Sequence, residues 1–163
     1  MEGEKKELTH IDEKGQAQMV DVGPKEETLR EAVARGRISM QPETFRLIRS
    51  HQVAKGDVLG VARVAGIMAA KQASGLIPLC HPLQITKVDI SFESLREEQG
   101  FEIHSRIACV GRTGVEMEAL TSLTVAALTV YDMCKAVDRT MVISDICLVK
   151  KTGGKSGSYE HSG

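Results

Sequence analysis

The chain of 163 residues contains no tryptophan, and aromatic residues make up only 3% of it. A core built from Phe and Tyr is therefore excluded, and packing must rely on Val, Ile, Leu, Met and Ala. Aromatic platforms on which nucleic-acid bases could stack are excluded for the same reason. The chain also has almost no net charge, because 21 basic and 22 acidic residues leave −1 at pH 7. No nucleic-acid partner is expected, and any basic site must be local.

Long apolar runs are missing as well, and the N-terminus reads Met-Glu-Gly-Glu-Lys-Lys-Glu, the opposite of a signal peptide. We therefore expect no membrane partner. None of the four cysteines belongs to a C-x-x-C pair that would indicate zinc or a redox dithiol. These cysteines are Cys80, Cys109, Cys134 and Cys147. Buried thiols in a reducing cytoplasm fit both the spacing of the cysteines and the N-terminus, which is unlike a signal peptide.

The length, with 42% hydrophobic residues, is sufficient for one globular domain with its own core. Composition divides the chain into three parts. We expect a polar arm over residues 1–26, a single domain over 27–149, and a flexible tail rich in glycine and lysine over 150–163.

Apolar residues alternate over 29–40 and predict a strand, although a short helix competes there. Pro42 opens a brief helix that ends near residue 51. Asp57 stands where an N-cap would, ahead of a helix predicted over 58–72, and Gly75 follows it as a C′ glycine. That second helix is apolar nearly all round. It must be covered either in a subunit interface or by deep burial within the chain.

Two alternating segments, 85–95 and 101–110, are joined by Arg-Glu-Glu-Gln-Gly and predict a hairpin. An apolar stripe predicts a helix over 115–137, and a β-branched strand follows over 141–149. The order strand, helix, strand, strand, helix, strand indicates an α+β fold of the ferredoxin-like, split-βαβ kind. We expect a four-stranded antiparallel sheet with helices packed on one face.

The tail contains Gly-Lys-Ser at residues 154–156, which looks like the end of a phosphate-binding P-loop. A P-loop needs glycine where Val149 stands, and it must lead into a helix for which no residues remain. The P-loop interpretation therefore fails. Lys150, Lys151 and Lys155 instead suit a glycine-loosened lid that closes over an anion, or simply a frayed basic end.

Charged residues on the 115–137 helix need an explanation. Asp132 and Lys135 share a face in its mostly apolar last third, as an exposed ion pair or as an acid–base couple at a pocket wall. Glu116 and Glu118 in the first turn suit the helix dipole, and they could also accept hydrogen bonds from the N–H groups of a guanine-like ring. Lys55 precedes a helix N-terminus that attracts anions.

Cys80 and His81 lie in a loop stiffened by Pro82. Adjacent side chains on an extended chain point apart, so the two cannot form a nucleophile–base pair. The more plausible role for His81 is that of a hydrogen-bond donor to a substrate.

Several stretches together resemble one family, cyclic pyranopterin monophosphate synthase, the molybdenum cofactor biosynthesis protein C. The stretches are Met19-Val-Asp-Val, Lys55-Gly-Asp-Val, Ala65-Gly-Ile, Leu76-Ile-Pro-Leu-Cys-His-Pro-Leu, Thr113-Gly-Val-Glu-Met-Glu-Ala-Leu-Thr, Ala126-Ala-Leu-Thr-Val-Tyr-Asp-Met-Cys-Lys-Ala-Val and Gly153-Gly-Lys-Ser-Gly. The similarity runs from about Leu8 to Gly157.

The resemblance implies a lyase that rearranges a GTP-derived compound, 3′,8-cyclo-7,8-dihydro-GTP, to cyclic pyranopterin monophosphate and releases pyrophosphate. It implies no redox cofactor and no metal site, while Mg²⁺ accompanying the triphosphate stays open. It also implies a homo-oligomer, a hexamer built as a trimer of dimers with active sites near the dimer interface.

Residue by residue, the resemblance makes Asp132 the acid–base residue, with Lys135 beside it and Lys55 in the same pocket. Lys151 would reach the triphosphate. The residues that would line or face the substrate site are Leu79, Cys80, His81, Met117, Glu118, Glu116 and Arg30.

Two other functions compete with the synthase. An RNA-binding module on the same fold would need aromatic residues on its middle strands in a basic pattern, which the sequence lacks. A non-catalytic domain that senses a purine nucleotide would bind tightly without turnover, and Asp132→Ala would leave its binding nearly intact.

Overall fold

The computed structural model describes residues 11–12, 14–155 and 157–161. Its elements in chain order are β1 (Thr28–Ser39), α1 (Pro42–Arg49), α2 (Val58–Leu76), β2 (Ile85–Ser94), a 3-10 turn (Arg96–Glu98), β3 (Gly100–Gly111), α3 (Glu116–Cys134), β4 (Val142–Thr152) and β5 (Tyr159–Glu160). The first ten residues of the expected arm lie outside this description.

The strands form one antiparallel sheet in the order β2-β3-β1-β4-β5. Its first four strands have the order expected of a split-βαβ fold, so the α+β, ferredoxin-like prediction is confirmed. The sheet has five strands, and the predicted number of four was wrong. The extra strand β5 consists of Tyr159 and Glu160, and so short a polar segment carries no alternation that a sequence could reveal.

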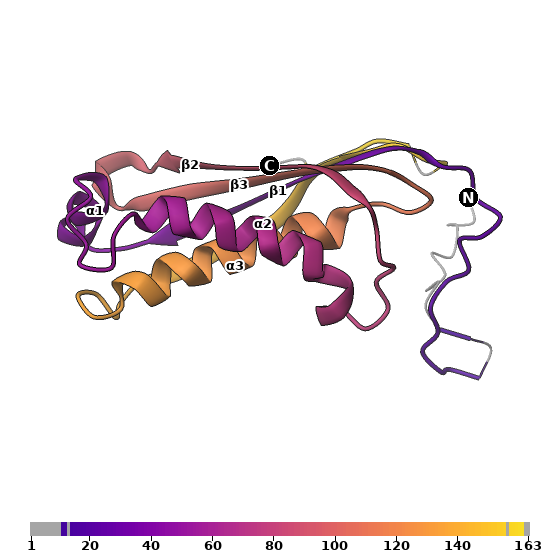
Figure 1. The fold of residues 1–163 in the computed structure, drawn as a ribbon, viewed down its shortest axis with the longest axis horizontal. Coiled ribbons are helices and arrows are strands. Elements are labelled where there is room, and N and C mark those ends of the chain that lie inside the picture. The colour runs from indigo at the N-terminus through magenta and orange to yellow at the C-terminus, as the bar shows by residue number, and fades with distance from the viewer. Residues whose placement is uncertain (1–10, 13, 156, 162–163) are drawn as a thin grey trace, which may run out of the picture.

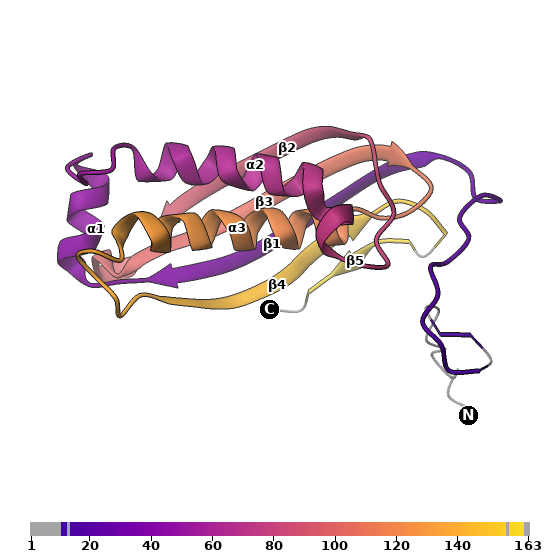
Figure 2. The same cartoon turned by 60° about the horizontal axis from the view of Figure 1, so that its bottom comes forward.

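Helices α2 and α3 lie side by side on one face of the sheet, and α1 covers one end (Figures 1 and 2). The core between them is mainly aliphatic, with Ile38, Ile103, Ile107 and Leu123 fully buried. Phe45 and Phe101 supply its aromatic contact, with ring centroids 5.0 Å apart. The packing is therefore built largely from the residue types that the composition required.

Helix α2 begins as predicted, because the Asp57 Oδ1 atom accepts a hydrogen bond of 3.0 Å from the Gly60 N–H group. Its predicted end at residue 72 was wrong, since the helix continues to Leu76 and contains Gly75. The chain leaves the helix at Ile77, whose backbone is extended (φ −105°, ψ 112°). Pro78 follows directly, and a residue before proline avoids the helical region.

Helix α3 stops at Cys134, three residues before the predicted end. Asp138 explains the early end, because its carboxylate accepts from the Thr140 N–H group at 2.8 Å and from the Gln41 N–H group at 2.9 Å. These bonds turn the chain and tie it to the start of α1. Strand β4 in turn extends three residues past the predicted end, to Thr152.

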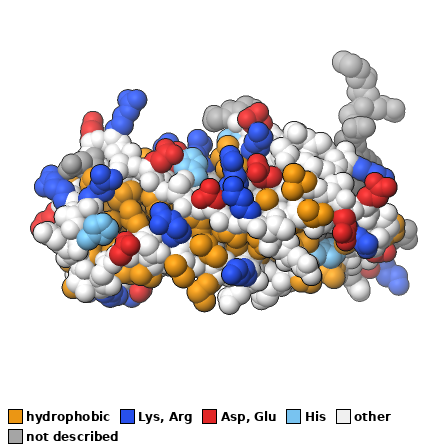
Figure 3. Space-filling view, turned by 45° about the horizontal axis from the view of Figure 1, so that its top comes forward, with side chains coloured by type: hydrophobic (Ala, Val, Ile, Leu, Met, Phe, Trp, Pro, Cys, Tyr) orange, Lys and Arg blue, Asp and Glu red, His pale blue; other side chains and the backbone are white. Residues whose placement is uncertain are grey.

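The apolar surface of α2 is only partly covered. Val61, Val64, Met68 and Leu76 are exposed by 46% to 58%, so neither the sheet nor α3 buries that side of the helix. The opposite face of the sheet carries acidic and basic side chains close together (Figure 3). Among the described residues, no helix has the length and hydropathy needed to cross a membrane.

Candidate functional site

Helix α3 runs along the sheet (Figure 2). Candidate site residues lie at both of its ends. Glu116 and Glu118 lie in its first turn, while Asp132 lies in its last. With a rise of about 1.5 Å per residue, Glu116 and Asp132 are separated by about 24 Å along the helix axis. A single chain therefore presents two separate half-sites.

The first half-site, at the C-terminal end of α3, is a cluster of Lys55, Asp132 and Lys135. The Lys135 ammonium group donates to Asp132 Oδ1 at 2.6 Å. The Lys55 ammonium group donates to the Asp132 main-chain oxygen at 3.0 Å and lies 3.6 Å from Asp132 Oδ2. The predicted trio is thus brought together, with Lys55 supplied by the loop that precedes α2.

All three side chains of this lysine–aspartate cluster are about half exposed, between 49% and 61%. The hydrogen bond from Lys135, with the positive charges of Lys135 and Lys55, holds the pKa of the Asp132 carboxyl below its ordinary value. The same hydrogen bond raises the pKa of Lys135. In the single chain the two groups therefore favour their charged forms.

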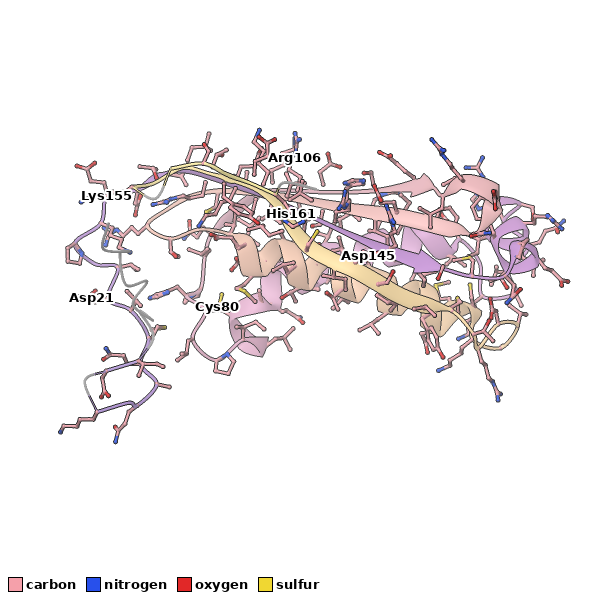
Figure 4. The ribbon with its side chains drawn as sticks, turned by 180° about the vertical axis from the view of Figure 1, so that it is seen from behind. Asp21, Cys80, Arg106, Asp145, Lys155 and His161 are labelled. Carbon is pink, nitrogen blue, oxygen red and sulfur yellow. The ribbon has the colours of Figure 1, made fainter. Side chains whose placement is uncertain are left out.

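The second half-site, at the other end of α3, is a hollow of about 1000 Å³ between the arm, β1, the β3–α3 turn and the end of β4. We call it the basic hollow. Its basic residues are Lys25, Arg30, Arg112, Lys151 and Lys155. Its acidic residues are Glu26, Glu31 and Glu116. Figure 4 shows Lys155 and Cys80 toward the same end of the molecule, where the arm leaves the domain.

Arg30 is the most deeply placed charge of the basic hollow, with 8% of its surface exposed. Its guanidinium donates to the main-chain oxygens of Gly111 at 3.3 Å and Arg112 at 3.4 Å. None of the ion pairs between described residues involves Arg30. A nearly buried guanidinium without a counter-charge, facing an open hollow, is a site for an anion.

The tail forms part of the wall of the basic hollow, through Gly153, Gly154 and Lys155. Gly153 and Gly154 have φ values of +99° and +76°, and Gly154 lies so close to the Arg30 guanidinium that a side chain there would overlap it. The Lys151 ammonium group donates to Glu116 Oε1 at 2.9 Å. An anion entering the hollow would therefore compete with Glu116 for Lys151.

Cys80, in the loop after α2, contacts Glu118 in the first turn of α3. The Cys80 Sγ atom is 3.5 Å from Glu118 Oε1, and Glu118 is only 2% exposed. Burial, with the nearby charges of Glu118 and Glu116, raises the pKa of the Cys80 thiol to about 11. Cys80 is thus a protonated thiol at neutral pH, unsuited to nucleophilic attack.

His81 contacts the arm. Its Nε2 atom lies 2.8 Å from the Val20 main-chain oxygen. Since a carbonyl oxygen can only accept, this nitrogen carries the proton and donates it to the arm. The expected donation from His81 to a substrate would require that the arm give up this hydrogen bond.

Comparison with known protein families shows which family this chain belongs to. The model of the MoaC family matches residues 19–154. The chain belongs to the MoaC family.

Curated relatives agree along almost the whole chain. The cyclic pyranopterin monophosphate synthase of Heliobacterium modesticaldum is 64% identical over 152 residues, which cover 93% of this chain and 96% of the relative. The protein of the same name from Pelotomaculum thermopropionicum is 62% identical over 156 residues, covering 96% and 92%. That from Chloroflexus aurantiacus is 57% identical over 154 residues, covering 94% of both chains.

The structure places the residues carried over from the MoaC family in two groups. Lys55, Asp132 and Lys135 form the lysine–aspartate cluster. The others gather around the N-terminal end of α3, where Leu79 is half-buried in the loop after α2 and Met117 is 36% exposed. Glu118 is 2% exposed, and the Cys80 thiol lies against its carboxylate.

Sequence reasoning missed Arg112, whose guanidinium donates to the Gly23 main-chain oxygen at 3.1 Å and lies 3.7 Å from Glu27. Its position just before a helix N-terminus was the available signal. The Val20 contact of His81 had no signal, because a main-chain oxygen belongs to any residue type. Among the described residues, no group of three or more His, Cys, Asp and Glu side chains could hold a metal ion.

Proposed function

We propose that this protein is a cyclic pyranopterin monophosphate synthase, a lyase that converts 3′,8-cyclo-7,8-dihydro-GTP to cyclic pyranopterin monophosphate with release of pyrophosphate. The observation that carries the proposal is the buried, unpaired Arg30 at the floor of the basic hollow. A triphosphate supplies the missing negative charge. Curated relatives that align along nearly the whole chain carry this enzyme name.

The basic hollow holds the triphosphate, and Lys151 exchanges Glu116 for a phosphate oxygen. Cyclising one phosphate and expelling pyrophosphate concentrates negative charge on the leaving group. Basic groups fixed in advance around that charge stabilise it. Any Mg²⁺ arrives with the triphosphate, and the protein contributes no resident metal or redox cofactor.

The lysine–aspartate cluster carries out the proton transfers needed while the guanine-derived ring is opened and rebuilt. Asp132 acts as the base and Lys135 as the acid beside it, with Lys55 holding Asp132 in place. Each positioned acid or base contributes roughly 10² to 10⁴ in rate.

The two half-sites meet between subunits. About 24 Å of helix separates them in one chain, farther than a single nucleotide-sized ligand needs to reach from its phosphates to its ring. A second copy therefore places its lysine–aspartate cluster opposite the basic hollow of the first. The exposed apolar side of α2, with Val61, Val64 and Met68, supplies surface for such an assembly. We propose a hexamer built as a trimer of dimers, working in the cytoplasm.

A single-turnover assay with 3′,8-cyclo-7,8-dihydro-GTP tests the proposal. We expect the wild-type protein to release pyrophosphate and form the pterin, and the folded variants Asp132→Ala and Lys135→Ala to be inert. Exposed Asp145, which belongs to neither half-site, provides the matched control Asp145→Ala. If the wild-type protein binds the compound without turnover, the protein is a nucleotide sensor and not a synthase.

A further inference from the structure

Asp138 is a buried carboxylate that lies in the turn after α3, with 4% of its surface exposed. None of the ion pairs between described residues involves it. Its Oδ1 atom accepts hydrogen bonds from the Thr140 N–H group at 2.8 Å and the Thr140 hydroxyl at 2.7 Å. Its Oδ2 atom accepts from the Gln41 N–H group at 2.9 Å and the Thr44 hydroxyl at 3.3 Å. A carboxylate has about four acceptor sites, so these donors take up its full capacity.

Two of these donors belong to the start of α1. Gln41 is the N-cap residue of that helix, and its own side chain makes no capping hydrogen bond. Asp138 therefore supplies from a distance the acceptor that α1 lacks, and its negative charge suits the positive end of the helix dipole. Burial alone would raise the pKa of Asp138, but the hydrogen bonds from Gln41, Thr140 and Thr44 outweigh it and hold the pKa below its ordinary value.

The same carboxylate is fixed to the last turn of α3. The Asp138 N–H group donates to the Cys134 main-chain oxygen at 3.0 Å. Cys134 ends the helix turn that carries Asp132, and Lys135 follows it directly as the C-cap. Asp138 is thus tied on one side to two members of the lysine–aspartate cluster.

On its other side, α1 leads into the loop that carries Lys55, the third member of the cluster. The Gln52 N–H group donates to the Leu47 main-chain oxygen at 2.9 Å. The Gly56 N–H group donates to the Val53 main-chain oxygen, also at 2.9 Å. Because these hydrogen bonds keep the connection compact, a shift of α1 is transmitted to Lys55.

We propose that Asp138 is a positioning residue for the reaction, which holds the start of α1 against the end of α3 and thereby sets the distance between the Lys55 ammonium group and Asp132. Phe45 and Ile48 also anchor α1 in the core. Such apolar contacts are non-directional, so they fix the place of the helix less closely than hydrogen bonds do. The inference rests on the proposed function, because Asp132 is the base of that reaction.

The pKa of Asp132 tests this positioning without any substrate. Asp138→Asn keeps the shape of the side chain but replaces one acceptor oxygen by a donor, so that one N–H group loses its partner. We expect the pKa of Asp132 to rise toward its ordinary value, because Lys135 and Lys55 together depress it. Loss of the Asp138 charge alone would act in the opposite direction, since a nearby negative charge raises the pKa of a carboxyl group. An Asp132 pKa that NMR titration finds unchanged or lowered overturns the proposal.

Two further variants support this titration. Thr44→Val removes one donor to Asp138 and keeps the shape of the side chain, so it should raise the Asp132 pKa by a smaller amount even if Asp138→Asn does not fold. Asp145→Asn is the matched control, because it removes an exposed carboxylate that belongs to neither half-site. The control should leave the Asp132 pKa where it is in the wild type.

Kinetics with 3′,8-cyclo-7,8-dihydro-GTP give a second readout. Asp138→Asn should lower kcat about tenfold to a hundredfold, since a misplacement of about 1 Å can cost that much. KM should change little, because the triphosphate binds at the other end of α3. A variant that loses stability in urea while kcat and the Asp132 pKa stay unchanged overturns the proposal. If the wild-type protein shows no turnover, the proposed function fails and the catalytic role of Asp138 with it, whereas the titration still decides whether Asp138 positions Lys55.

Discussion

Arg30 and Glu118 both lie near Cys109 at the N-terminal end of α3, and neither forms an ion pair with another described residue. The charges of these two side chains can be balanced in different ways. An arginine keeps its charge under all ordinary conditions, so its counter-charge must come from a ligand. A carboxyl group can instead take up a proton. Of the two side chains, only Arg30 therefore requires an anion from outside the chain.

Replacing Arg30 tests the anion site. Arg30→Met should raise the KM for the triphosphate substrate by about tenfold or more, because a hydrogen bond to a charged group is worth about 1.5 to 3 kcal/mol. Arg30→Lys should recover only part of the loss, since an ammonium group cannot make the forked contacts of a guanidinium. Steady-state kinetics at several salt concentrations provide the measurement. Arg96→Met, at an exposed turn, is the control, and equal KM values in all variants would contradict the prediction.

Asp132 provides a prediction on pH. Because Lys135 and Lys55 depress its pKa in the folded state, its ion pairs contribute stability above the ordinary Asp pKa. That contribution is lost as pH falls through the lower, folded value. In Lys135→Met, the pKa of Asp132 should rise toward its ordinary value. Titration of the Asp132 carboxyl carbon by NMR measures this shift, with Asp145 as an internal reference. An Asp132 pKa that stays where it is in the wild type would refute the assignment.

At the scale of elements, the sequence predicted the type and order of the core strands and helices. Their ends depended on contacts that no local pattern contains. Gly75 looked like a helix terminator, but the extended conformation forced on Ile77 by Pro78 decided where α2 ends. The end of α3 depended on Asp138, whose partner Gln41 lies far away in the chain. The spacing of Asp132 and Lys135 predicted that they share one face of the helix. It could not predict how far they lie from the basic hollow.

The N-cap of α2 offers a test of local stability. Asp57→Ala removes the acceptor for the Gly60 N–H group and should lower the free energy of unfolding by about 1 kcal/mol. Asp57→Asn keeps an acceptor oxygen and should lose much less. Urea denaturation at fixed protein concentration measures both, since an oligomer's stability depends on concentration. Equal losses in the two variants would show that the side-chain hydrogen bond is not what stabilises the helix start.

Strand β5 holds the tail loop in place. Tyr159 and Glu160 pair with the end of β4, and the His161 N–H group donates to the Val149 main-chain oxygen at 2.8 Å. Removing residues 158–163 should therefore free the loop over the basic hollow and raise KM about threefold to tenfold, the cost of ordering one or two side chains on binding. A comparison of KM and kcat between the full chain and the truncated one decides this. A loss in kcat alone would mean that the tail takes part in the chemistry.

At the scale of the whole molecule, the separation of the two half-sites along α3 leads to a complementation experiment. Asp132→Ala removes the base from one half-site, and Lys151→Ala weakens the other. Each variant alone should be nearly inactive. If one subunit supplies the lysine–aspartate cluster and its neighbour supplies the basic hollow, a mixed dimer contains one intact site and one doubly defective site.

Mixing the two variants after mild dissociation should then restore activity to on the order of a quarter of the wild-type level, because half of randomly paired dimers are mixed and each has one good site of two. Mixing either variant with itself is the control for the dissociation step. If each active site lies within a single chain, every subunit in the mixture keeps its own defect and no activity returns. Recovery or its absence therefore distinguishes a shared site from a contained one, whatever the number of subunits in the assembly.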